Sequence, residues 1–131
     1  MIHVAHWKMR GINLLLDNIA IQIISSLFSP LLDLIYLPQG WNLLYVSLAV
    51  IIQLAIIFSY FVFLEGTYGK TLGKIATQTR VVHNSGEPIT YKQAALRTLC
   101  RLFPLDLITF FESNPIGFHD EMSKTLVVID K

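Results

Sequence analysis

The sequence has few charged residues and a single cysteine. Only 15% of its 131 residues are Asp, Glu, Lys or Arg, whereas soluble proteins average roughly 25%. Together with 53% hydrophobic residues and a mean hydropathy of +0.56, this predicts one small membrane domain covering residues 1–131. A net charge of +1 argues against nucleic-acid binding, which needs a clustered basic face. Cys100 has no second cysteine to pair with, and we interpret it as a small core thiol.

The first long apolar segment runs from about 11 to 35, which exceeds the roughly 20 residues that a membrane-spanning helix needs. Several polar residues interrupt it, so we expect the helix to turn a polar sector toward protein. Pro30 predicts a kink or an early stop, because proline removes a main-chain hydrogen bond. The polar residues that we place along a possible path through the membrane are Asn13, Asp17, Asn18 and Gln22.

The second apolar segment, about 42–64, contains no charged residue and is the clearer membrane span. Lys8 and Arg10 precede the first span, and Lys70 and Lys74 follow the second, whereas the connection between the spans has no basic residue. The positive-inside rule therefore predicts a cytoplasmic N-terminus, with the chain returning to the cytoplasm at Glu65.

The segment from 65 to 92 changes character and predicts a glycine-containing turn followed by a β-hairpin. Residues 77–83 alternate toward a turn, and 88–91 could form the return strand. The C-terminal region, about 118–130, ends in the β-branched run KTLVVI. A lone hairpin is only marginally stable, so we expect this run to add a third strand to a small cytoplasmic sheet.

The third apolar region, about 93–112, contains Arg97, Arg101, Pro104 and Asp106. The two arginines are four residues apart and share a helical face, so a spanning helix would bury two cations. We favour an amphipathic interfacial helix, re-entrant near Pro104, over a third crossing. The predicted fold class is mainly α and integral to the membrane, with two transmembrane helices.

Asp17 is the most informative single residue, because a carboxylate at membrane depth is costly. Arg10 precedes it by seven residues, roughly 10 Å along a helix and on nearly the same face, so we predict an Arg10–Asp17 ion pair. In a functional interpretation, Asp17 exchanges Arg10 for a proton or cation. In a structural interpretation, which we favour, Arg10 neutralises Asp17 and fixes helix packing.

Other basic residues have two interpretations each. Lys70 and Lys74 could bind a phosphate or lipid headgroup through a glycine-containing turn, although the turn is not a P-loop. We favour a tight turn that directs both lysines to the anionic leaflet. Arg97 and Arg101 could hold lipid phosphates or pair with Asp120 or Glu121. His3 and His6 are too few for a structural metal site, and we expect no cofactor.

Five segments, in this order and spacing, resemble the RDD family of bacterial membrane proteins: RGINLLLD (10–17), LEGTYGKTLGK (64–74), TRVVHNSG (79–86), QAALRTLCR (93–101) and FHDEMSKTLVV (118–128). The residues that name the family correspond to Arg10, Asp17 and Asp120. The run IATQ at 75–78 departs from the leucine and glycine that the family often carries before the strand. The resemblance implies a multi-pass protein of the bacterial cytoplasmic (inner) membrane. It also implies transport of an unidentified ligand, with sodium–proton exchange in some members.

Two function classes follow from the sequence. The first is an oligomeric transporter of an ion or small ligand, since two helices cannot enclose an aqueous path. The second is an accessory or assembly subunit that binds another membrane protein and transports nothing itself. We do not expect an enzyme, because no nucleophile, base and orienting group can be assembled from these residues.

Overall fold

The computed structural model describes residues 3–36, 42–102 and 118–130. Its elements in chain order are α1 (Trp7–Tyr36), α2 (Leu43–Tyr68), α3 (Leu72–Ala76), β1 (Thr79–His83), α4 (Tyr91–Leu102), α6 (Phe118–Ser123) and β2 (Thr125–Ile129). The predicted mainly helical class is confirmed.

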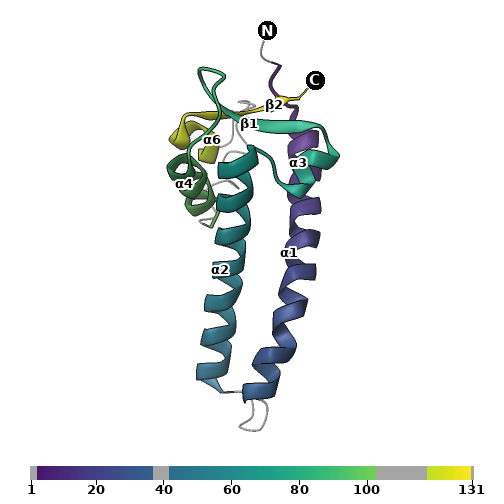
Figure 1. Ribbon diagram of the computed structural model, residues 1–131, viewed down its shortest axis with the longest axis vertical. Coiled ribbons are helices and arrows are strands. Elements are labelled where there is room, and N and C mark those ends of the chain that lie inside the picture. Colours follow the sequence, from purple (N-terminus) through teal and green to yellow (C-terminus); the bar gives the residue numbers. More distant parts are fainter. Residues whose placement is uncertain (1–2, 37–41, 103–117, 131) are drawn as a thin grey trace.

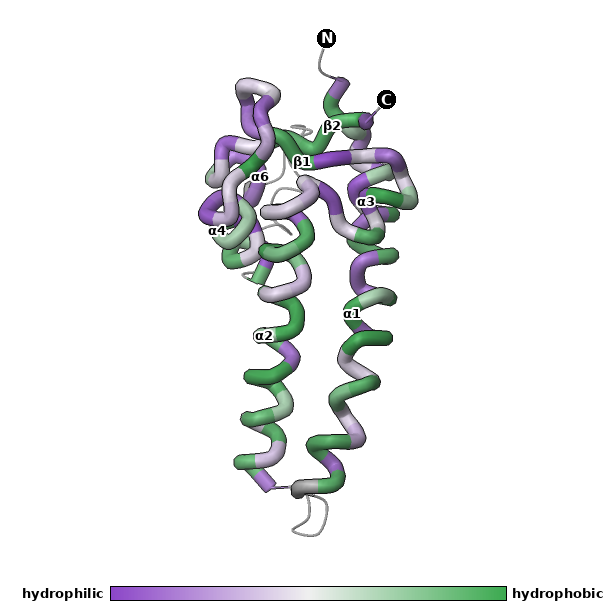
Figure 2. The backbone as a smooth tube through the Cα atoms, in the orientation of Figure 1, coloured by the Kyte–Doolittle hydropathy of each residue, from purple (hydrophilic) through white to green (hydrophobic). Residues whose placement is uncertain are grey.

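Two long helices dominate the shape of the molecule. Helices α1 and α2 lie side by side, and the shorter helices, the sheet and both chain ends gather at one end of the pair (Figure 1). Figure 2 shows hydrophobic residues concentrated along the two long helices and hydrophilic residues at that shared end, which we call the head. Both helices are long and apolar enough to cross a membrane. Between them, Ile21, Tyr60 and Phe61 form a small buried cluster.

The sequence predicts a kink or an early stop at Pro30. Helix α1 continues through this residue, so the early stop is wrong. Proline has no N–H to donate to the carbonyl oxygen four residues earlier, which here belongs to Ser26. The Ser29 hydroxyl donates to that oxygen over 3.3 Å and replaces the missing hydrogen bond.

Helix α2 extends past the predicted end at residue 64. It begins after Asn42, whose side chain accepts from the Tyr45 N–H over 2.8 Å. It ends at Gly69, whose left-handed backbone (φ 66°) lets its N–H donate to the Glu65 carbonyl. Glu65 therefore belongs to the last turns of α2, and the short helix α3 occupies part of the predicted turn.

The sheet contains two antiparallel strands within the described residues, so the predicted three-stranded sheet is not confirmed. The C-terminal strand β2 pairs directly with β1, with Thr79 opposite Ile129 and His83 opposite Thr125. The expected return strand at 88–91 is reduced to a single bridge from Val82 to Pro88, because proline cannot donate to a ladder. On its other side, β2 meets the N-terminal segment through a bridge at Val4.

Helix α4 begins at Tyr91 and covers the first part of the predicted third element. It packs mainly against α2 and α6. Its Ala94 also joins a small apolar core with Ala5, Val81, Ile89 and Val127. Pro104 and the predicted re-entrant turn lie outside the described residues.

Candidate functional site: a buried polar and charged network in the head

Asp17 is buried where α1 meets α2 and α3. Its Oδ1 accepts from the Tyr60 hydroxyl over 2.9 Å and from the Gly73 N–H over 2.8 Å, and its Oδ2 accepts from the Thr71 hydroxyl over 2.7 Å. The predicted Arg10–Asp17 pair is wrong, since Arg10 pairs with Asp120. Asp17 is instead hydrogen-bonded by three uncharged donors, one on α2 and two at the start of α3.

Gly73 makes this arrangement possible. A Cβ atom at this position would meet the Asn13 carbonyl oxygen and would lie 3.0 Å from Asp17 Oδ1. The absence of a side chain therefore lets the α3 backbone approach α1 closely enough to hydrogen-bond. The Asn13 side-chain amide adds hydrogen bonds with the hydroxyls of Thr77 and Thr79.

Glu65 forms the centre of the charged part of the network and is fully buried. Its Oε1 lies 2.9 Å from Lys74 Nζ and 3.3 Å from Arg101 Nη2, and its Oε2 accepts from Arg97 Nε over 3.0 Å. Helix α2 positions the carboxylate, and α3 and α4 supply the cations. Burial of so many charges is tolerated only because each has partners.

Asp120 links this centre to the first helix. It pairs with Arg97 and with Arg10, and Arg97 Nη1 also donates to the Thr125 hydroxyl. Of the interpretations left open for Arg97, pairing with Asp120 is the one that the structure contains. The connected series Arg10–Asp120–Arg97–Glu65 therefore ties together α1, α6, α4 and α2. We call Glu65, Lys74, Arg97, Arg101, Asp120 and Arg10 the charge network.

The pKa shifts outside the long helices favour the charged forms of Asp120 and Arg97, but not of Lys74. Burial opposes ionisation of Asp120, but Arg97, His119 and Arg10 outweigh burial and hold its pKa at about 2. Burial also acts against the charged form of Arg97, and there Asp120 and Glu65 raise the pKa above its usual value. Burial lowers the pKa of Lys74 more than Glu65 raises it.

The remaining predicted site residues divide into two groups. Asn18 and Gln22 are exposed on the outer face of α1, whereas Asn13 and Asp17 are buried, so the four do not form one path within a single chain. Lys70 pairs with Asp130. Lys74 is 3% exposed, which makes its predicted lipid contact wrong: Glu65 draws it inward instead.

Sequence reasoning missed Glu65, Tyr60 and Thr71. Glu65 carried one usable signal, because it is the sole acidic residue between 42 and 74, directly after an uncharged apolar run. A carboxylate in that position needs a cationic partner nearby. Tyr60 and Thr71 carried no comparable signal, since their role depends on the meeting of three helices.

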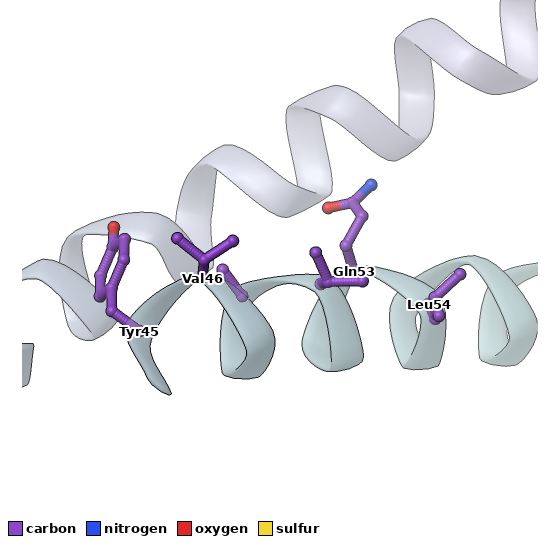
Figure 3. Close-up of a pocket in the computed structure, with 6 residues that line it drawn as sticks. Tyr45, Val46, Gln53 and Leu54 are labelled. Atoms are coloured by element: carbon purple, nitrogen blue, oxygen red, sulfur yellow. The ribbon is translucent and has the colours of Figure 1, made fainter. Parts of the chain in front are cut away.

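Elsewhere, the structure has an open groove of about 400 Å³ along α2, away from the head. Its lining is mostly apolar, and Figure 3 shows Gln53 extending from it toward the neighbouring helix. Within the described residues, no group of three His, Cys, Asp or Glu side chains could hold a metal ion.

Comparison with known proteins gives one match. The model of the RDD family matches residues 4–122, which include α1, α2, α4 and the charge network. Searches of curated proteins and of solved structures found no match. This match and the two long apolar helices indicate a membrane protein. Because the matched region covers most of the chain, the chain belongs to the RDD family.

Proposed function

We propose that this chain is an assembly subunit of the bacterial cytoplasmic membrane that holds another membrane protein along the outer face of α1. In this proposal α1 and α2 both cross the bilayer, and the head lies in the cytoplasm. The start of α1, the connection from α2 to α3, and α4 all lie at the head end (Figure 1). These segments carry Lys8, Lys70 and Lys92, which fits the positive-inside rule.

The observation that carries the proposal is a polar stripe on α1, formed by Asn18, Gln22, Ser26 and Ser29. These residues follow one another at spacings of four, four and three, and all are exposed. Asn18 and the two serines donate to carbonyl oxygens of their own helix, whereas Gln22 has no hydrogen bond within the described residues. Amide groups at membrane depth favour contact with another helix over contact with lipid.

The head supports an assembly role because its buried charged groups pair with one another within the chain. Glu65 and Asp120 each contact at least two cations of the same chain, and Asp17 is held by three donors. Such a network fixes the relative positions of the helices. The head thus acts as a rigid support from which α1 presents its stripe.

Co-purification from the native membrane tests this proposal. We expect a membrane protein to accompany the parent chain in a fixed ratio and to be lost from Gln22→Leu. The matched control is Leu27→Ala, because Leu27 is 74% exposed on α1 but lies outside the stripe. Equal recovery with Gln22→Leu, or a parent that purifies only as a homo-oligomer, would contradict the proposal.

A second candidate function is cation or proton transport by a homo-oligomer. The favouring observation is the concentration of oxygen atoms around Asp17, which include the Thr71 and Tyr60 hydroxyls. In this case the stripes of several copies would line a shared path. Proton flux in proteoliposomes driven by sodium, potassium or lithium, present in the parent and lost in a folded Asp17→Asn variant, would favour transport. Absence of flux in both would exclude it under those conditions.

A further inference from the structure

Helix α4 buries an arginine and exposes three leucines. Arg97 and Thr98 are buried beside Ala94 and Cys100, while Leu96, Leu99 and Leu102 are 37%, 46% and 38% exposed. A surface helix in water normally buries its leucines and exposes its arginines. Exposed leucines at spacings of three suit a helix that lies against acyl chains.

Among the described residues, the charges beneath this helix do not balance. In residues 3–36, 42–102 and 118–130, the buried or largely buried ionisable side chains of the head are four cationic and three anionic groups, a difference of one positive charge (4 − 3 = 1). The cations are Arg10, Lys74, Arg97 and Arg101, and the anions are Asp17, Glu65 and Asp120. Excess charge at low dielectric is unfavourable, so the site favours an added anion.

Arg97 provides independent support for a missing anion. Its side chain is completely buried, and among the described residues its Nη2 has no hydrogen-bond partner, although Nε and Nη1 are both paired. Buried guanidinium donors are rarely left unpaired.

Arg101 connects this buried excess charge to the surface. It lies one helical turn beyond Arg97, and its side chain is 16% exposed. Its guanidinium lies 4.5 Å from the centre of the Phe61 ring, and its Nη2 contacts Glu65. Glu65 does not repel an incoming anion strongly, because Lys74 and Arg97 already neutralise it. The ring and the carboxylate hold the arginine in place next to the leucine face.

We propose that Arg101, with Arg97 behind it, binds the phosphate of an anionic phospholipid whose acyl chains cover Leu99 and Leu102. Arginine presents a fork of donors that matches phosphate oxygens. The adjoining leucines favour a lipid phosphate over a free one, since they offer acyl chains an apolar surface. This inference does not depend on the proposed assembly role, because it uses α4 and not the stripe on α1.

Native mass spectrometry of the full chain in detergent tests the proposal. The protein is titrated separately with phosphatidylglycerol and with phosphatidylcholine, which carries no net charge. We expect one phosphatidylglycerol to bind in preference to phosphatidylcholine, and Arg101→Gln to weaken that binding by roughly tenfold. Lys92→Gln is the control, because it removes the same charge from an exposed position of the same helix.

Two further measurements separate a lipid site from a site for soluble phosphate. Arg101→Lys retains the charge without the fork and should bind with intermediate strength; it replaces Arg101→Gln if that variant does not fold. Displacement of the lipid by inorganic phosphate at a similar concentration would assign the site to a soluble phosphate and overturn the lipid assignment. Equal binding of the two lipids, or equal losses in Arg101→Gln and Lys92→Gln, would overturn the site itself.

Discussion

Replacing Glu65 with glutamine removes the central anion of the charge network while almost preserving its shape. Three cationic groups lie within 3.3 Å of the Glu65 oxygens, and the side chain is fully buried. Loss of one partner from a buried ion pair costs about 3–5 kcal/mol, because the remaining charge is left uncompensated. Domains of this size unfold with about 5–15 kcal/mol, so Glu65→Gln should remove a large fraction of the stability.

Equilibrium unfolding in detergent micelles, followed by circular dichroism, measures this loss. Glu87→Gln is the matched control, because Glu87 is exposed at the turn after β1, and its change should stay within about 0.5 kcal/mol. The loss in Glu65→Gln should shrink as pH rises. Burial lowers the pKa of Lys74, so this lysine can shed its proton once its partner is gone, whereas arginine cannot. A loss below about 1 kcal/mol would refute the central role of Glu65.

Two further predictions concern Asp120 and the contact between α1 and α3. The pKa of Asp120 is lowered to about 2, so its stabilising effect is complete above its unfolded value near 4 and disappears as pH falls toward 2. Thermal unfolding between pH 6 and 2 should therefore show an acid loss that is about 2 kcal/mol larger in the parent than in Asp120→Asn; identical pH profiles would contradict the assignment. Gly73→Ala should destabilise the fold by about 1–3 kcal/mol, because its methyl group meets the Asn13 carbonyl. Gly11→Ala, which meets nothing within 4 Å, should be neutral or stabilising in the same assay, and equal effects would argue against a close α1–α3 contact.

Local sequence patterns predicted the elements well and their contacts poorly. The two apolar segments and the amphipathic start of the third element followed from composition and periodicity, which act over a few turns. The Arg10–Asp17 pair failed although its spacing was suitable, because proximity along one helix does not exclude a better partner from elsewhere. Arg10 reaches Asp120, which is 110 residues away, and Asp17 receives donors from α2 and α3.

Contacts between distant segments also explain why the predictions for Lys74 and for the return strand of the sheet were wrong. Lys74 looked like a surface cation beside a membrane, but the extension of α2 by one turn placed Glu65 within its reach. The return strand looked continuous in sequence, but Pro88 stopped the ladder, and β2 and the N-terminal segment completed the pairing.

The sequence by itself determined that the chain has two long apolar helices, because helix length and hydropathy are properties of neighbouring residues. It also indicated that Asp17 would lie against protein, since a carboxylate at membrane depth is costly in contact with lipid. Only the tertiary structure decided which charges meet. Ion pairing depends on distances of a few ångströms between segments that are far apart in the chain, and those distances are set by how α3, α4 and α6 pack on the ends of α1 and α2.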